Sequence, residues 1–245
     1  MHPEICRIGP LVIYSYGFAL VVAFFVVTTL ASIEAKRRGT NPDIIYNLIF
    51  IAFITGVIGA RILYVFQNLN YYIKSPLEIV MLQRGGLSWF GGLFLGITSS
   101  IIYLKIKKLE IYKVADIVVP YLALGQAIGR FGCFFNGCCY GRESVYGIYF
   151  PVHDKILIPT QLYSALISLI IFIILRWILD NPHRQGQILF TYLLLYSIKR
   201  FFIEFFRADN PQILFSLTLF QIMSIAVFML AAIKLGLIFL KEKDQ

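Results

Sequence analysis

Long apolar runs alternate with short polar segments along the chain. The runs lie near residues 11–32, 43–66, 87–106, 113–130, 159–179, 186–206 and 213–240. Each run approaches the roughly 20 residues that an α-helix needs to cross the hydrocarbon core of a bilayer, and a helix satisfies its own backbone hydrogen bonds in lipid. The pattern therefore predicts an all-α integral membrane protein with about seven transmembrane helices.

The composition agrees with this prediction. Of the 245 residues, 59% are hydrophobic and only 14% are charged, and the mean hydropathy is +0.77. Soluble domains carry about 25% charged residues. The net charge of +9 does not indicate a nucleic-acid partner, because the basic residues are spread among short connections between the apolar runs. The lipid bilayer is the partner that the composition predicts.

The basic residues fall on alternate connections, which predicts the orientation of the chain. They are Lys36, Arg37 and Arg38, then Lys105, Lys107, Lys108 and Lys113, then Arg176 and Arg184, and finally Lys241 and Lys243. Connections rich in lysine and arginine stay in the cytoplasm. We therefore expect the N terminus outside and the C terminus in the cytoplasm.

The outward connections differ from the cytoplasmic ones in composition. Residues 67–86 contain tyrosines, a proline and a glycine pair, and residues 131–158 are rich in glycine, cysteine and aromatic residues. Both segments are expected to be structured. Because the sequence shows no repeat or linker, residues 1–245 are predicted to form a single polytopic membrane domain.

Several ionisable residues lie within the apolar runs: Arg61, Arg130, Lys199, Arg200 and Glu204. A charged group at the centre of a membrane helix costs roughly 2.5–3.5 kcal/mol, so these side chains need partners or water. All of them are predicted to lie near the outward ends of their helices. For Arg61, extension of the side chain to the lipid headgroups is an equally good interpretation.

Tyr196, Arg200 and Glu204 are spaced by four residues, so they are predicted to share one helix face. An arginine–glutamate pair that only neutralises itself in lipid is the simplest interpretation of this stripe. Several arginines at headgroup depth favour a further role, since a guanidinium group matches the oxygens of a phosphate. Phosphatidylglycerol or another anionic phospholipid is therefore a candidate ligand.

A segment rich in glycine and cysteine, residues 129–142, follows the fourth run. Its glycines permit close approach of the backbone and positive φ angles, and Asn136 adds a neutral hydrogen-bonding group. Cys133, Cys138 and Cys139 lack the sequence spacing of a tetrahedral zinc site, so no metal is predicted there. A disulfide, an inert apolar role and a reactive thiol are the remaining interpretations of these cysteines.

These features together resemble the prolipoprotein diacylglyceryl transferase family over most of the chain. The resemblance is carried by Tyr16-Gly17, Gly59-Ala60-Arg61, Gly85-Gly86-Leu87-Ser88, Gly91-Gly92-Leu93, Asp116, Pro120, Gly129-Arg130, Asn136-Gly137, Gly141-Arg142, residues 159–163, Tyr196, Arg200 and Glu204. The order and the spacing of these short motifs are specific, although each motif alone is modest.

The resemblance implies an activity: transfer of a diacylglyceryl group from phosphatidylglycerol to the lipobox cysteine thiol of prolipoproteins, with release of glycerol phosphate. It also implies no cofactor and a multi-pass protein of the bacterial inner (cytoplasmic) membrane, with the active site toward the outer face. The implied catalytic residues are Arg130, Arg200, Glu204 and Tyr16. The implied substrate-binding residues are Arg61, Asn136, Gly141, Tyr196, Gly91 and Gly92.

The chain departs from the family pattern at three positions. Phe90 stands where the family usually has a histidine that has been proposed as a general base, and Cys133 and Cys138 stand where it usually has Asn and Glu. Glu204 and His153 are candidate replacements for that base, although a solvated loop position is the simpler interpretation of His153. Two alternatives to the implied activity therefore remain: a phospholipid-dependent transferase with a different acceptor, and a non-catalytic protein that binds or translocates lipid.

Overall fold

The computed structural model describes residues 1–8, 11–81, 85–208 and 210–240. The backbone divides into two compact units. Unit 1 comprises Met1–Ala31 and Ala115–Gln245, and unit 2 comprises Ser32–Val114. Each unit is described by itself below.

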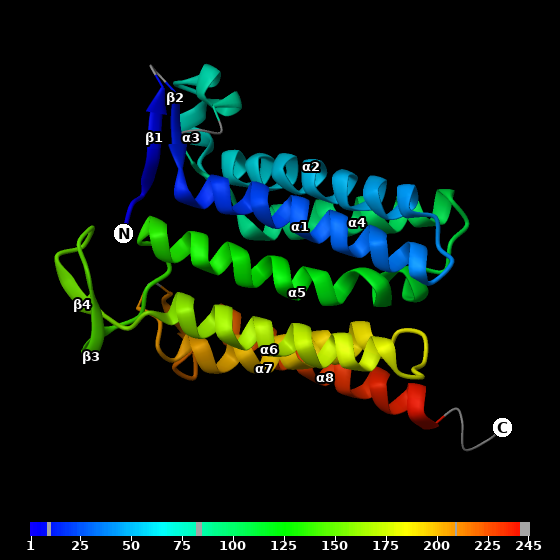
Figure 1. The fold of residues 1–245 in the computed structure, drawn as a ribbon. Helices are drawn as coiled ribbons and strands as arrows, with labels where there is room; N and C mark the ends of the chain where they lie inside the picture. Colours follow the sequence, from blue (N-terminus) through cyan, green and yellow to red (C-terminus); the bar gives the residue numbers. More distant parts are fainter. Residues whose placement is uncertain (9–10, 82–84, 209, 241–245) are drawn as a thin grey trace. The chain divides into compact units, whose positions relative to one another are not determined.

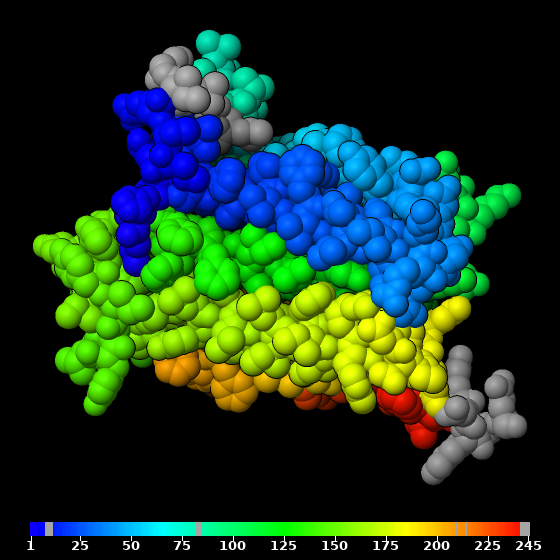
Figure 2. Space-filling view, viewed as in Figure 1, coloured from blue at the N-terminus to red at the C-terminus, as the bar shows by residue number. Residues whose placement is uncertain are grey.

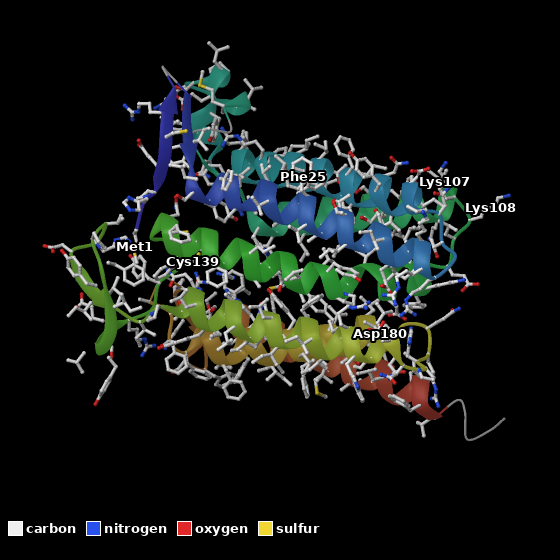
Figure 3. The ribbon with its side chains drawn as sticks, viewed as in Figure 1. Met1, Phe25, Lys107, Lys108, Cys139 and Asp180 are labelled. Carbon is white, nitrogen blue, oxygen red and sulfur yellow. The ribbon has the colours of Figure 1, made fainter. Side chains whose placement is uncertain are left out.

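Six helices in the described residues are long and apolar enough to cross a membrane. They are α1 (Ser15–Arg37), α2 (Pro42–Gln67), α4 (Trp89–Ile106), α5 (Ile111–Asn136), α6 (Thr160–Asp180) and α8 (Leu219–Leu240). Large apolar side chains remain exposed along them, such as Phe25 on α1 (Figure 3). Phe94 on α4 is another example. Apolar surface of this extent is typical of contact with lipid. The prediction of an all-α integral membrane protein is confirmed.

The predicted helix near 186–206 forms α7 (Gln187–Glu204). This helix is not among the six, because its 18 residues include Lys199, Arg200 and Glu204. The remaining short helices are α3 (Leu69–Tyr72) and η1 (Pro76–Val80), both in unit 2. The most polar long helix of the described chain therefore carries the stripe that the sequence singled out.

The core of unit 1 lies where α5, α6 and α7 pack together (Figure 1). Its buried members are Val119, Ala123, Ile171, Leu175, Leu179, Ile188 and Tyr192. Helix α7 also packs against α8. Asp116 of α5, which is 2% exposed, accepts hydrogen bonds from the backbone N–H groups of Gly186 at 2.6 Å and Leu189 at 2.8 Å. A carboxylate at this position satisfies N–H groups that a helix start leaves unpaired, so Asp116 fixes where α7 begins.

Three antiparallel pairs of short strands complete unit 1: β1 (Glu4–Ile8) with β2 (Leu11–Tyr14), β3 (Glu143–Phe150) with β4 (Lys155–Leu157), and β5 (Gln212–Leu214) with β6 (Leu217–Thr218). The β3–β4 pair extends beyond the ends of α5 and α6 (Figure 1), and its green atoms project from unit 1 in the space-filling view (Figure 2). The segment predicted to be structured near 131–158 thus contains the last turn of α5, a turn and a β-hairpin.

Unit 2 is built on the contact between α2 and α4. A Cβ atom placed on Gly59 would lie 2.4 Å from the carbonyl oxygen of Gly91, and one placed on Gly91 would lie 2.2 Å from the oxygen of Gly59. Glycines at a helix crossing let the two backbones touch, which is how membrane helices gain packing contacts without a hydrophobic driving force. Gly59 and Gly91 therefore each have a packing role at the crossing of α2 and α4.

Candidate functional site

The polar stripe on α7 is anchored by an ion pair between Arg200 and Glu204. The distance between Arg200 Nη2 and Glu204 Oε2 is 3.1 Å, and both side chains are largely buried. The Arg200 guanidinium carbon also lies 4.2 Å from the ring centre of Phe220 on α8. The spacing of four residues in the sequence predicted this pair correctly.

Glu204 has further partners that hold its carboxylate in place. Its Oε1 accepts hydrogen bonds from Asn210 Nδ2 at 2.6 Å and from Thr218 Oγ1 at 2.9 Å. These two hydrogen bonds and the ion pair hold the carboxylate in one position, so Glu204 orients Arg200.

Lys199, next to Arg200 in the sequence, is only 6% exposed. Its Nζ donates to Ser168 Oγ at 2.9 Å and to Gln126 Oε1 at 3.3 Å, and it lies 4.7 Å from the ring centre of Tyr196. These partners are neutral, so hydrogen bonds and not an ion pair hold the Lys199 side chain in the interior of unit 1. The sequence marks this lysine only as an ionisable residue within an apolar run, outside the predicted site.

Arg130 of α5 and Tyr16 of α1 belong to the same end of unit 1. Arg130 lies within electrostatic range of Lys199, Arg200 and Tyr16. It is half-buried, and it makes no hydrogen bond or ion pair with the residues that the structure describes. Tyr16 packs beside Gly132, the helical glycine one half-turn after Arg130. Arg130 is therefore a cation whose donors are available to a ligand.

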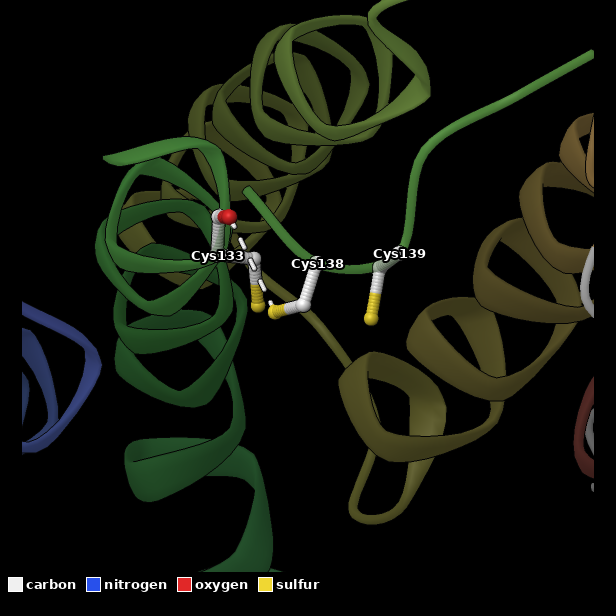
Figure 4. Close-up of side chains that lie close together, drawn as sticks. All are labelled: Cys133, Cys138 and Cys139. Carbon is white, nitrogen blue, oxygen red and sulfur yellow. Dashed lines mark hydrogen bonds between the residues drawn. The ribbon is translucent and has the colours of Figure 1, made fainter. Parts of the chain in front are cut away.

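Helix α5 continues to Asn136, six residues beyond the predicted end at residue 130. Cys133 therefore lies on the last turns of the helix, and Cys138 and Cys139 follow it in a tight turn (Figure 4). The three Sγ atoms lie within 4.8 Å of one another. All the cysteines, including the exposed Cys6 on β1, are free thiols. Cys139 lies at the end of unit 1 opposite to Asp180 (Figure 3).

The first residues of α6 hold the cysteine turn. Thr160 Oγ1 donates to the carbonyl oxygen of Cys139 at 2.7 Å, and Gln161 Nε2 donates to that of Cys138 at 2.7 Å. Both side chains are buried. Thr160 and Gln161 belong to a motif that carried the family resemblance, but no local pattern in the sequence connects them with the cysteines.

The turn also has partners on its other side. Gly141 forms a β-bridge with Arg207, and a Cβ atom on Gly141 would lie 2.6 Å from the carbonyl oxygen of Phe206. Asn136 lies beside the Cys138 thiol. Gly141 thus has a packing role that accounts for its place in the motif.

The electrostatic setting differs between the two thiols of the turn: the pKa of Cys139 is lowered, whereas that of Cys138 is raised. Cys138 Sγ donates to the carbonyl oxygen of Cys133 at 3.7 Å (Figure 4), and the neighbouring thiols of Cys133 and Cys138, with the positive charges of Arg130 and Arg207, lower the pKa of the Cys139 thiol. Tyr16 lies within electrostatic range of all three thiols. Tyr16 therefore lies near both the cysteine turn and Arg130.

His153 lies against the same turn and is not a freely solvated loop residue. Its Nε2 is 2.8 Å from the carbonyl oxygen of Gly137, and its ring centre is 4.2 Å from that of Tyr140. With Nε2 donating to a carbonyl, the imidazole acts as a brace for the backbone.

Arg61, in unit 2, is only 6% exposed. Its Nε, Nη1 and Nη2 donate to the carbonyl oxygens of Ile79, Gly85, Gly86, Glu78 and Met81. Since a guanidinium has five N–H donors, these bonds use all of them. Arg61 clamps the segment after α2, and its role in substrate binding remains a prediction, as do the binding roles of Gly91 and Gly92.

The fold and the site define an integral membrane protein of helices with a buried cationic cluster and a thiol cluster at one end of unit 1. Comparison of the chain with known proteins identifies its family. Residues 3–237 match the family model described as prolipoprotein diacylglyceryl transferase. The chain belongs to the prolipoprotein diacylglyceryl transferase family.

Individual relatives match over most of their length. A protein of Bacillus cytotoxicus is 35% identical over 239 residues, which cover 93% of this chain and 88% of the relative. One of Clostridioides difficile is 40% identical over 195 residues, covering 80% and 79%, and one of Clostridium tetani is 31% identical over 216 residues, covering 85% and 86%. All three are named phosphatidylglycerol–prolipoprotein diacylglyceryl transferase.

Proposed function

We propose that this protein transfers a diacylglyceryl group from phosphatidylglycerol to the lipobox cysteine thiol of a prolipoprotein, releasing glycerol phosphate. The observation that carries the proposal is the buried ion pair of Arg200 with Glu204, with Arg130 and Lys199 within electrostatic range of Arg200. Buried cations at the end of a membrane protein suit a phosphodiester at the lipid surface. The names of the relatives agree with this substrate pair.

In this reaction the acceptor thiolate attacks the glyceryl carbon that carries the phosphate. A carbon–sulfur bond forms, the carbon–oxygen bond breaks, and the electron pair leaves on the phosphate oxygen. Negative charge therefore grows on the leaving phosphate. Arg130 and Arg200 stabilise that charge, while Glu204 and Phe220 keep Arg200 in a fixed orientation before the reaction begins.

Tyr196 and Tyr16 complete the proposed phosphate site. Tyr196 packs against Lys199 and lies within electrostatic range of Arg200. Tyr16 places a hydroxyl group near Arg130. Two tyrosines at the rim of a membrane-embedded site suit the boundary between the lipid tails and the headgroups.

The distribution of basic residues supports a location in the bacterial inner membrane, with the N terminus and this end of unit 1 at the outer face. The donor lipid reaches that end from the bilayer, and the prolipoprotein presents its lipobox cysteine there.

Complementation tests the proposal in cells. A strain depleted of its own diacylglyceryl transferase is expected to grow when it expresses this chain, and not when it expresses Arg130→Ala or Arg200→Ala. Arg7→Ala on β1, which changes an arginine with an exposed side chain, is the matched control and should support growth. Failure of the unaltered, membrane-inserted chain to support growth or to lipidate prolipoproteins would contradict the proposal.

A further inference from the structure

The thiol cluster has a geometry that the sequence spacing did not predict. Cys133 comes from the last turns of α5, and Cys138 and Cys139 come from the turn that follows, yet their Sγ atoms all lie within 4.8 Å of one another (Figure 4). A zinc ion with sulfur ligands at about 2.3 Å in tetrahedral geometry places neighbouring sulfurs about 3.8 Å apart. Small rotations of these side chains would bring the three sulfurs to that separation.

The backbone of the turn is arranged to bring the thiols together. Gly137 has φ of 74°, and Cys139 has φ of 62°. The left-handed region favours glycine, so a cysteine at position 139 is held there at a conformational cost. The hydrogen bonds from Thr160 and Gln161 to the two cysteine carbonyls hold this conformation. Clusters held by such strain are typical of functional sites.

We propose that Cys133, Cys138 and Cys139 bind a thiophilic divalent cation of the zinc class, and that the open fourth position of this cation takes the acceptor thiol of the prolipoprotein. The role of the fourth position rests on the proposed transferase function. Three protein ligands with one open position is the arrangement of catalytic zinc sites, whereas structural sites are closed by four protein ligands. No fourth cysteine or histidine belongs to the cluster within the described residues.

The charges around the cluster suit this site. Three thiolates and a divalent cation carry a net charge of minus one, and coordination of the acceptor thiolate makes it minus two. Arg130 and Arg207 lie within electrostatic range of Cys139 and oppose that charge. Because Arg130 also belongs to the proposed phosphate site, the coordinated thiolate and the donor lipid would meet at the same end of unit 1.

The chemistry that such a cation supplies is activation of the acceptor. A thiol that coordinates a zinc-class cation is deprotonated, and its proton passes to water. The bound thiolate attacks the glyceryl carbon, the carbon–sulfur bond forms, and the carbon–oxygen bond breaks with its electron pair going to glycerol phosphate. The thioether product is a neutral, weaker ligand and leaves the cation. This route needs no side-chain base. That suits a chain with Phe90 at the position where the family usually has the histidine proposed as a general base.

Metal binding is measured directly on the reduced full-length protein in detergent. After treatment with a chelator, the protein is titrated with Zn²⁺ and, separately, with Co²⁺, whose thiolate complexes absorb in the near ultraviolet. We expect one ion per chain and a thiolate-to-Co²⁺ absorption band. Cys133→Ser, Cys138→Ser and Cys139→Ser should each weaken Zn²⁺ binding at least tenfold, and Cys6→Ser, at the exposed cysteine on β1, should leave it unchanged.

A measurement on the unaltered protein covers the case in which a variant does not fold. Bound Zn²⁺ should protect the three cluster thiols, and not Cys6, from a maleimide reagent. Addition of a lipobox peptide should change the Co²⁺ spectrum, and a peptide with serine in place of the lipobox cysteine should not. Absence of stoichiometric metal, unprotected cluster thiols, or an unchanged Co²⁺ spectrum with the cysteine peptide would overturn the proposal.

The same samples separate this inference from the proposed function. If the chelator-treated, metal-free protein still lipidates the peptide at its full rate, the metal inference is overturned and the transferase function stands. If the metal binds and the cysteine peptide changes its spectrum, but phosphatidylglycerol never yields a thioether, the site stands and the transferase function fails.

Discussion

Arg200 and Glu204 lie one turn apart on α7, with 3.1 Å between Nη2 and Oε2, and Glu204 is held in turn by Asn210 and Thr218. The proposed mechanism gives Arg200 the task of stabilising charge on the leaving phosphate. Arg200→Ala should therefore lower kcat by about 10²–10³, the usual cost of losing one preorganised donor. Arg200→Lys should restore part of the rate, since it keeps the charge and loses the planar fork. Initial rates of lipidation measure both, and a kcat for Arg200→Ala within twofold of the unaltered protein would contradict this role.

Glu204→Gln tests whether the carboxylate matters for its charge. The amide oxygen can still accept from Thr218, but Arg200 loses its ion-pair partner in a buried setting. Removal of one member of a buried pair costs about 3–5 kcal/mol, so the melting temperature in detergent should fall clearly. Glu143→Gln, whose side chain is exposed and paired with Lys155 on β4, is the matched control and should leave it unchanged. Equal melting temperatures for the two variants would show that Glu204 is not the anchor.

Gly59→Ala should destabilise unit 2, because the new Cβ would lie 2.4 Å from the carbonyl oxygen of Gly91 and would force α2 and α4 apart. Overpacking of this kind costs about 1–3 kcal/mol. Gly236→Ala on α8 is the control, since its Cβ would meet nothing within 4 Å and alanine favours a helix. Thermal unfolding of both variants in the same detergent measures the difference. A Gly59→Ala protein as stable as Gly236→Ala would rule out the close crossing.

Asp116→Ala should destabilise unit 1, because it removes the acceptor of the Gly186 and Leu189 N–H groups at the start of α7. Leaving buried donors unpaired costs about 1–3 kcal/mol for each group. Asp180→Ala removes only the exposed side of the Arg176–Asp180 pair and should have a much smaller effect. Hydrogen exchange at the first turn of α7 checks the mechanism: exchange should become faster there in Asp116→Ala and not in Asp180→Ala.

The parts of the site that the sequence could predict are those with a local pattern. The spacing of Tyr196, Arg200 and Glu204 predicted their shared face, because the helix repeat alone decides it. The length of the apolar runs predicted that the helices cross a membrane. The predicted start at residue 11 was early, since Leu11–Tyr14 forms β2 and the helix begins at Ser15.

The remaining parts depend on contacts between distant segments. Thr218 approaches Glu204 through the β5–β6 hairpin, and Gln126 and Ser168 approach Lys199 from two other helices. Arg61 gives its donors to carbonyls 17 or more residues away. No periodicity in the sequence carries this information, because tertiary packing sets it.

The clustering of the three cysteines could not be predicted from the sequence either. Their spacing does not match a zinc motif, which is why the sequence favoured no metal. The continuation of α5 to Asn136 and the left-handed backbone at Cys139 bring the thiols together in space. A motif search compares spacings along the chain, whereas coordination depends on distances between sulfur atoms.

The decisive measurement of the proposed transfer is the mass of a lipobox peptide after incubation with the purified protein in proteoliposomes that contain phosphatidylglycerol. We expect a peptide heavier by one diacylglyceryl group, attached to the cysteine as a thioether, with glycerol phosphate released in equal amount. Arg130→Ala and Arg200→Ala should each slow the formation of this product by about 10²–10³, and Arg7→Ala should leave its rate unchanged. Glycerol phosphate released without a lipidated peptide, or lipid bound without any covalent product, would contradict the account.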